Sequence, residues 1–417
     1  MLRIVAVCAI VAGSGPLQAR APDVQPWILP TIGAHASQPD LTVAGSGLLL
    51  GWVEKREGGQ HALRASRFGT HGTWDAARTI ASGTGWFVNW ADTPHLIALE
   101  DGSLWAHWLR RNGTGTYDYG IALVRSDDDG KTWSDPVRVE PEGLMSDYGF
   151  VTFWRQSRDT LGIAWLDSRQ KSAAKPSATS AADHSHAHAS HGAGAMMLRA
   201  AVFDSAGKRT REWPLDISTC DCCPTASAST ARGTVVVYRG RTADEIRDTR
   251  IVRFDGTSWS TPQTVHADGW RFAGCPVNGP AVAAHGDDVW VAWYTEADGQ
   301  PSVRIAYSAD AGENFTEPVR VASGRDLLGR VALAAESGSA WLTWLGERGG
   351  SVSGQEVWLA RLDAKSVAPV YNTRIAELSA RGRASGLPRI AARDGVAWVV
   401  WTDIIDTKPQ LRGVSVR

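Results

Sequence analysis

Val289-Trp290-Val291-Ala292-Trp293 is a short apolar stretch that ends in an aromatic residue. The same pattern occurs seven times along the chain. The copies occupy residues 48–52, 104–108, 161–165, 235–238, 289–293, 340–344 and 397–401. Their final aromatic residues are 51 to 57 residues apart, except for one interval of 73 residues between Trp165 and Tyr238. A near-constant period of this length indicates a repeated structural unit.

Each copy is one strand of a larger unit. Before the second copy, a strand-like segment ends in the turn Glu100-Asp101-Gly102-Ser103, and Asp-Gly is a strong hairpin signal because both positions tolerate a positive φ. A third strand, residues 121–125, and a fourth, residues 136–139, follow. Four short strands per repeat predict an all-β protein, a β-propeller of seven four-stranded blades, with six blades as the alternative.

The two ends of the chain supply one incomplete blade between them. The last copy, residues 388–417, holds only three strands, while residues 27–32 form an unpaired strand-like piece near the N-terminus. Pairing the two ends would close the ring and remove its open edges. We therefore predict that an N-terminal strand closes the last blade.

Residues 1–21 have the pattern of a secretory signal peptide. Arg3 precedes an apolar run over residues 4–12, and Ala19-Arg20-Ala21 offers a cleavage site. The alternative is a buried N-terminal strand. We expect an exported protein, periplasmic or secreted, whose residues 22–417 form a single propeller domain. The apolar run is too short to span a bilayer, so no transmembrane segment is expected.

The formal net charge is −1, so no basic field attracts nucleic acid. We expect no nucleic-acid partner and a monomeric protein.

Two turns between third and fourth strands share a detailed pattern. Ser126-Asp127-Asp128-Asp129-Gly130-Lys131-Thr132-Trp133 fits Ser-x-Asp-x-Gly-x-Thr-Trp throughout, and residues 308–315 fit it with Asn and Phe in the last two places. This pattern resembles the Asp-box, or BNR, repeat of the sialidase superfamily. The resemblance implies a sialidase-type propeller over nearly the whole mature chain. It also implies that Asp128 and Asp310 are structural and lie on the face opposite the active site.

The catalytic signature of that family is not matched. Its enzymes hold the substrate carboxylate with three arginines, the first in an Arg-Ile-Pro strand, and Pro388-Arg389-Ile390 is the nearest equivalent here. They also use a Tyr–Glu nucleophile pair and an Asp acid, which cannot be placed residue by residue. The resemblance implies a divergent glycoside hydrolase, exo-α-sialidase-like if catalytic, or a glycan-binding protein for acidic sugars.

Function is expected in the long loops of the opposite face, around blades three to five. The loop over residues 239–250 concentrates arginines and carboxylates. Its candidate catalytic residues are Arg239, Glu245, Arg247, Asp248 and Arg250. Arginine forks match a carboxylate, and Glu245 or Asp248 could transfer protons, with Tyr148 or Tyr294 as a partner. The alternative is a solvated ion-pair network.

A low-complexity loop at 171–195, rich in His, Ala and Ser, accounts for the long interval of the repeat. It contains four histidines in a His-x-His-x-His-x-x-His tract, namely His184, His186, His188 and His191. Such a tract suggests capture of a transition metal such as copper or zinc. The alternative is a solvated linker without a specific role.

Four cysteines remain after removal of the signal peptide. They are Cys220, Cys222, Cys223 and Cys275. The first three stand at the entrance to blade four and the last at the entrance to blade five, so the two segments should meet. They could form two disulfides, the default for an exported chain, or a thiolate metal site helped by the His tract. The alternative functions are therefore a non-hydrolytic metal-binding propeller and a protein-binding envelope propeller.

Overall fold

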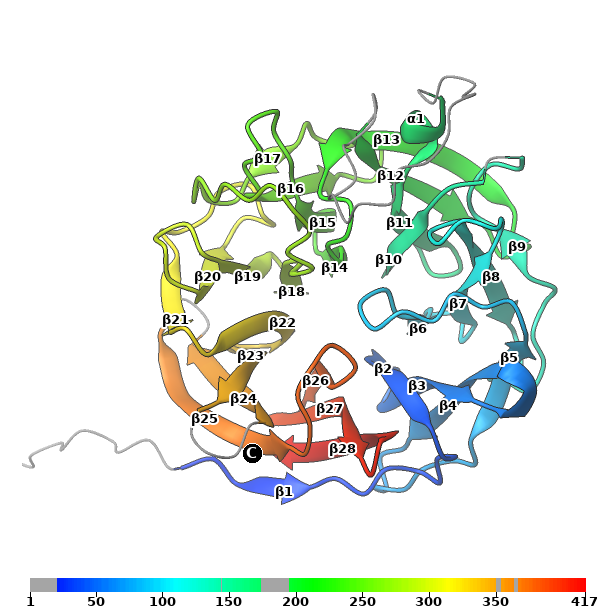
Figure 1. The fold of residues 1–417 in the computed structure, drawn as a ribbon, viewed down its shortest axis with the longest axis horizontal. Helices are drawn as coiled ribbons and strands as arrows, with labels where there is room; N and C mark the ends of the chain where they lie inside the picture. Colours follow the sequence, from blue (N-terminus) through cyan, green and yellow to red (C-terminus); the bar gives the residue numbers. More distant parts are fainter. Residues whose placement is uncertain (1–20, 144, 174–194, 350–353, 364–366) are drawn as a thin grey trace, which may run out of the picture.

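The computed structural model describes residues 21–143, 145–173, 195–349, 354–363 and 367–417. Seven antiparallel four-stranded sheets surround a central axis (Figure 1). This confirms the all-β, seven-bladed propeller, and the alternative of six blades is wrong. Within the described ranges, no helix is long and apolar enough to cross a membrane.

The first four blades follow one another along the chain. Blade 1 consists of β2 (Ala36–Ala44), β3 (Gly47–Lys55), β4 (His61–Phe68) and β5 (Arg78–Gly83), with a 3-10 turn at Glu57–Gly59. Blade 2 consists of β6 (Leu96–Ala98), β7 (Leu104–Arg111), β8 (Tyr119–Ser126) and β9 (Val137–Arg138). Blade 3 consists of β10 (Tyr148–Arg155), β11 (Leu161–Asp167), β12 (Met196–Phe203) and β13 (Arg209–Thr219), with helix α1 (Arg169–Ala173) after β11. Blade 4 consists of β14 (Ala226–Thr230), β15 (Gly233–Arg239), β16 (Thr249–Phe254) and β17 (Gln263–Thr264).

The last three blades repeat this order. Blade 5 consists of β18 (Ala281–His285), β19 (Asp288–Thr295), β20 (Ser302–Ser308) and β21 (Val319–Ser323). Blade 6 consists of β22 (Leu327–Glu336), β23 (Ser339–Arg348), β24 (Gly354–Asp363) and β25 (Pro369–Leu378). Blade 7 consists of β26 (Gly386–Arg393), β27 (Val396–Ile405), β28 (Lys408–Val416) and β1 (Val24–Pro26).

The N-terminal strand closes the last blade, as predicted. Val24 pairs with Val416 and Pro26 with Val414, so β1 is the outermost strand of blade 7 (Figure 1). The expected strand over residues 27–32 is wrong in its bounds, because those residues leave the sheet after β1. Trp27 still donates its backbone N–H to the Gly413 carbonyl at 2.9 Å, and its buried ring contacts Phe68 and Trp74 of blade 1.

The aromatic residues of the repeat form the core between blades. Trp52 and Trp165 are fully buried, and a buried indole N–H needs an acceptor. The acceptor lies two residues later in both: Glu54 accepts from Trp52 and Asp167 accepts from Trp165, each at 2.9 Å. These carboxylates are themselves buried, so they serve the repeat itself.

The two patterned turns have the same hydrogen bonds. The Asp128 carboxylate accepts from the Thr132 backbone N–H at 2.8 Å and from its hydroxyl at 2.7 Å. In the other turn Asp310 accepts from the Asn314 backbone N–H at 2.9 Å and from its side-chain amide at 2.8 Å, so Asn replaces Thr without loss. The hydrogen bonds from Thr132 lower the pKa of Asp128 to about 2. Both carboxylates thus hold their own turns.

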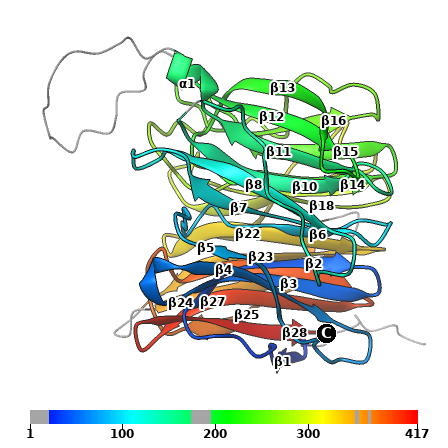
Figure 2. The same cartoon turned by 90° about the vertical axis from the view of Figure 1, so that its right-hand side faces the viewer.

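Because all blades have the same strand order, every inner strand starts at one face of the ring, which we call the upper face. Loops between blades, and loops between second and third strands, lie on this face. Figure 2 shows the ring edge-on; the upper face is on the left of that picture, where α1 lies. The patterned turns lie on the lower face.

Three polar side chains near the starts of inner strands bind the next blade, and we call these contacts inter-blade latches. Each accepts a backbone N–H at 2.8 Å: Asp40 from Leu96, Asp92 from Phe150, and Asn278 from Arg330. All three acceptors are at least nine-tenths buried. Burial raises the pKa of Asp92 to about 7, although the hydrogen bond from Phe150 lowers it. The latches fix neighbouring blades where their sheets do not pair.

Replacing Asn278 by Ala should lower the free energy of unfolding by about 1–3 kcal/mol, because the N–H of Arg330 would lose its acceptor in a buried place. Urea denaturation of the two proteins measures this difference. Asn278→Asp is the control for the acceptor, because it keeps the oxygen that accepts from Arg330 and loses only the amide that donates to the Leu328 carbonyl at 3.2 Å. An Ala variant as stable as the native protein would show that the latch contributes nothing.

Candidate functional site

A cavity of about 450 Å³ lies along the axis of the ring and is lined by residues from all seven blades. Several inner strands bend where they enter this cavity, because one residue near the start of each has a positive φ. These residues are Gln38, Phe150, Val277, Arg330 and Leu387, with φ between 51° and 56°. A positive φ in a non-glycine residue is uncommon and indicates a locally imposed geometry. The bends place side chains at the upper mouth of the channel.

The charges that line this cavity are mostly positive. Arg155, Arg330 and Arg389 line it together with His95, while Asp40 is the sole carboxylate among the lining residues. Arg155 ends β10 and is held at the lower face by the carbonyls of two other blades. The excess of cations favours an anionic ligand at the upper mouth.

Trp90, Arg330 and Arg383 meet at this mouth, and we call them the anion cradle. The Cζ of Arg330 lies 4.4 Å from the ring centroid of Trp90, and that of Arg383 lies 5.5 Å from it. Among the described residues, neither guanidinium forms an ion pair. Burial, followed by the charge of Arg383, lowers the pKa of Arg330 to about 10. Two neighbouring cations without a counter-ion are a site for an anion.

A second polar group lies deeper in the channel. The Asp40 carboxylate bonds to Nδ1 of His95 at 2.9 Å, and Arg389 donates to the hydroxyl of Thr93 at 2.6 Å. Burial raises the pKa of Asp40, but His95, Arg389 and the Leu96 N–H outweigh it, so the pKa is lowered. Asp40 is therefore an ionised carboxylate that holds the channel wall.

The arginine-rich loop predicted as catalytic is used inside the protein. Arg239 is 1% exposed and donates to the carbonyls of Asn278 and Tyr294, each at 2.8 Å. Its Cζ also lies 4.8 Å above Trp270. Burial lowers the pKa of Arg239 to about 10. Arg239 joins blades 4 and 5 and does not face the channel.

The other predicted residues of this loop are also paired. Glu245 accepts hydrogen bonds from Arg241 at 2.5 Å and from Arg247 at 2.6 Å. Arg250 donates to Asp216 at 2.8 Å. Asp248 accepts from the backbone N–H groups of Gly269 and Trp270, each at 3.1 Å. The tyrosines considered as partners do not join them, because Tyr148 is fully buried and Tyr294 donates to Glu296 at 2.6 Å. This is the arrangement of an ion-pair network, and a catalytic role for the loop stays a prediction.

The cysteine segments meet as predicted, and we call Cys220, Cys222, Cys223 and Cys275 the sulfur cluster. Cys220 and Cys223 form a disulfide, while Cys222 and Cys275 are free thiols. The sulfurs of Cys220 and Cys222 are 4.0 Å apart, and those of Cys220, Cys222 and Cys223 all lie within 4.8 Å of one another. Thiolates at these distances could hold a soft metal if the disulfide were reduced. His184, His186, His188 and His191 lie outside the described residues.

The two thiols of the sulfur cluster shift each other's pKa in opposite directions. A hydrogen bond from Cys222, followed by the charges of Arg247 and Lys171, lowers the pKa of Cys275 to about 7, although burial and Asp221 oppose the shift. The same hydrogen bond raises the pKa of Cys222, followed by burial. Cys275 is exposed, so the more acidic thiol is the accessible one.

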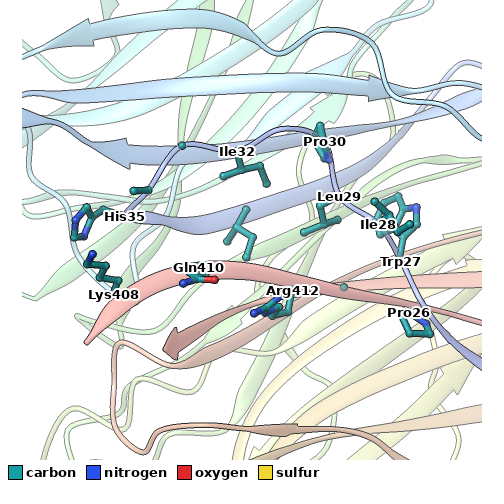
Figure 3. Close-up of a pocket in the computed structure, with 14 residues that line it drawn as sticks. Pro26, Trp27, Ile28, Leu29, Pro30, Ile32, His35, Lys408, Gln410 and Arg412 are labelled. Atoms are coloured by element: carbon teal, nitrogen blue, oxygen red, sulfur yellow. The ribbon is translucent and has the colours of Figure 1, made fainter. Parts of the chain in front are cut away.

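A second hollow, of about 530 Å³, lies between residues 26–35 and β28. Figure 3 shows Leu29, Ile32 and His35 on one side and Lys408 and Arg412 on the other. It lies at the seam where the N-terminal segment crosses from blade 7 to blade 1. We assign this hollow to ring closure.

Sequence reasoning missed the anion cradle. Trp90 comes from the loop before blade 2, Arg330 from β22 of blade 6, and Arg383 from the loop between blades 6 and 7, so no local pattern links them. Arg330 and Leu387 occupy equivalent places, because each lies in a register shift near the start of its inner strand, between Gly329 and Ala332 in β22 and between Gly386 and Arg389 in β26.

No protein-family model matches the chain, and no curated protein matches it significantly. Solved structures share its overall shape at low sequence identity. A K499G mutant of NanB sialidase from Streptococcus pneumoniae is 9% identical, with a TM-score of 0.45 over 95% of this chain and 94% of that one. The phage phi92 endosialidase is 12% identical, with a TM-score of 0.49 over 95% of this chain and 69% of that one.

A PL25 ulvan lyase is 11% identical, with a TM-score of 0.46 over 81% of this chain and 78% of that one. The resemblance to sialidases is one of fold. The blade count itself rests on the strand pairing of this chain.

Alkylation of Cys275 should be half-maximal near pH 7, because its folded-state pKa is lowered to that value and the thiolate is the reactive form. Iodoacetamide labelling at a series of pH values, read from the mass of the Cys275 peptide, measures the midpoint. Cys222→Ala removes the hydrogen bond and should move the midpoint up toward about 8.5. Cys222→Ser keeps a donor and is the control. An unchanged midpoint in Cys222→Ala would contradict this assignment.

Proposed function

We propose that this protein is an exported propeller that binds an acidic sugar at the upper mouth of its channel. The observation that carries the proposal is the anion cradle, in which two guanidinium groups face one tryptophan ring and have no carboxylate partner within the described ranges. Export is supported by the pattern of residues 1–21. A sugar that carries a carboxylate or sulfate matches both parts of the cradle.

The chemistry of the cradle selects such a ligand. Guanidinium groups bind a carboxylate through charge-assisted hydrogen bonds, which are about twice as strong as neutral ones. The Trp90 ring packs against both guanidinium groups and so helps to hold them at the mouth. Arg330 is already positioned, because its backbone N–H is held by Asn278 and one of its guanidinium N–H groups reaches the Ser385 carbonyl at 3.4 Å. The Arg330 side chain would therefore lose little conformational entropy when a ligand binds.

The geometry supports binding better than hydrolysis. Glycosidases commonly place two carboxylates across the scissile bond, and Asp40 is the one carboxylate among the lining residues of the channel. Asp40 is held by His95 and by the Leu96 N–H, and its lowered pKa makes it a poor proton donor. A divergent exo-α-sialidase-like activity is the alternative, and an assay with a fluorogenic sialoside tests it on the same sample.

Arg330→Ala should weaken binding of glucuronate or N-acetylneuraminate at least about tenfold, since a hydrogen bond to a charged group contributes roughly 1.5–3 kcal/mol. Trp90→Ala should weaken it as well, because it removes the ring against which both guanidinium groups pack. Isothermal titration calorimetry measures the affinity, with glucose as the neutral comparison. Arg361→Ala is the matched control, because Arg361 lies 5.2 Å above Trp341 within blade 6, away from the mouth.

Two outcomes would contradict the proposal. One is a native protein that binds neither acidic sugar more tightly than glucose. The other is an affinity that falls equally in Arg361→Ala and Arg330→Ala, because a change at the control position would report general loss of structure.

A further inference from the structure

Three members of the sulfur cluster lie close enough together to be ligands of one ion, and we call Cys220, Cys222 and Cys223 the three-sulfur site. Their sulfur atoms all lie within 4.8 Å of one another, and those of Cys220 and Cys222 are 4.0 Å apart. A metal–thiolate bond is about 2.3 Å long, so three sulfurs placed evenly around one ion are about 4.0 Å apart. Among the described residues this is the one group of three or more His, Cys, Asp or Glu side chains with such spacing.

The backbone around the three-sulfur site is held on both sides. The loop joins β13 to β14, and its first cysteine, Cys220, donates its backbone N–H to the Arg239 carbonyl at 2.9 Å. Just beyond the last cysteine, the hydroxyl of Thr225 donates to the Phe150 carbonyl at 2.7 Å. The two disulfide-bonded cysteines are at most 1% exposed, and Cys222 is half-buried. The three sulfurs are therefore brought together by an anchored loop and are largely shielded from water.

We propose that the three-sulfur site binds one Cu(I) ion when its cysteines are reduced, and that the Cys220–Cys223 disulfide is the closed, metal-free form of the site. Thiolates select soft ions such as Cu(I) and zinc. A structural zinc ion takes four ligands, and in the described part of the chain no fourth His, Cys, Asp or Glu ligand atom lies within 4.8 Å of all three sulfurs. Cu(I) binds three thiolates without a fourth ligand, so the number of sulfurs favours it. The site shares no residue with the anion cradle, so this proposal goes beyond the acidic-sugar site and does not depend on it.

The charged side chains beside the loop are compatible with such a site. The carboxylate of Asp221, which stands between two of the cysteines in the sequence, forms an ion pair with Lys171 at 2.6 Å and lies 3.6 Å from Arg241. This carboxylate is therefore engaged by cations. Three thiolates around a monovalent ion carry a net negative charge, and the two cations that border the loop partly offset it.

Opening the site requires two electrons. An external dithiol exchanges with the Cys220–Cys223 disulfide, becomes a disulfide itself, and leaves Cys220 and Cys223 as thiols. Cu(I) then bonds to the three sulfurs, and the three thiols release their protons to water, so the loaded site carries two negative charges. Copper keeps its oxidation state in this step. In the reverse direction an external disulfide oxidises Cys220 and Cys223 and is reduced to a dithiol with two protons from water, Cys222 regains its proton, and Cu(I) is released.

The test uses the full chain with Cys8→Ser, reduced by a phosphine, freed of the reductant and kept without oxygen. Cu(I) is shared between the protein and bicinchoninate, whose coloured complex reports the copper that the protein does not hold. Cys222→Ser should weaken Cu(I) binding at least about tenfold, since even the partners of metal ligands contribute about 10–100-fold. Cys275→Ser is the matched control and should keep the affinity, because it also replaces a free cysteine but lies outside the three-sulfur site. Both variants keep the histidines of residues 171–195, and circular dichroism checks that both keep the fold.

A second measurement needs no further variant. In the reduced protein Cu(I) should protect the three-sulfur site from iodoacetamide while Cys275 is still labelled, as read from peptide masses. The oxidised protein, in which two of the ligands are bonded to each other, should hold Cu(I) at least about tenfold more weakly. Equal Cu(I) affinity with and without Cys222→Ser, or in the oxidised and reduced forms, would overturn the proposal. So would a loss in Cys275→Ser as great as in Cys222→Ser, or one Zn²⁺ ion per chain that Cu(I) does not displace.

Discussion

The inter-blade latches are the interaction on which the rest of the molecule depends. In a propeller each blade contacts its two neighbours, and among the described residues each four-stranded sheet pairs its strands within one blade, with β1 and β28 completing blade 7. Near the channel the inner strands bend, so backbone N–H groups there point at a neighbouring blade. Asp40, Asp92 and Asn278 supply the acceptors those groups need. Each removes a buried unpaired donor and joins two blades at once.

The same bends build the candidate site. A strand that enters the channel with a positive φ turns one side chain toward the axis, and Arg330 occupies such a position. Its backbone is fixed by a latch, while its guanidinium has no carboxylate partner in the part of the chain that the structure describes. Stability and the proposed binding therefore use different atoms of one residue. A site made this way is preorganised, because the ring that holds it cannot relax without breaking a latch.

The fold was predictable because its determinants are local. Seven aromatic strands and their tight turns recur in order, and each turn carries its own chemistry, as Asp128 and Asp310 show. The bounds of the closing strand were less predictable, because β1 is set by its register with β28 at the far end of the chain. The direction of Arg239 was not predictable at all, since its acceptors lie on Asn278 and Tyr294, 39 and 55 residues away. Trp90 and Arg330 meet only because the ring brings blades 2 and 6 to one axis.

The meeting of the cysteine segments, by contrast, followed from blade order, and one glycine explains how closely they approach. A Cβ on Gly279 would lie 2.0 Å from the carbonyl oxygen of Pro224, a contact with backbone that nothing could relieve cheaply. Pro224 follows Cys223 directly, and Gly279 follows Cys275 by four residues. The absent side chain lets the two loops lie against each other, and it places an exposed thiol beside a buried disulfide. Close backbone approach at this seam, rather than the number of cysteines, is what brings the two cysteine segments together.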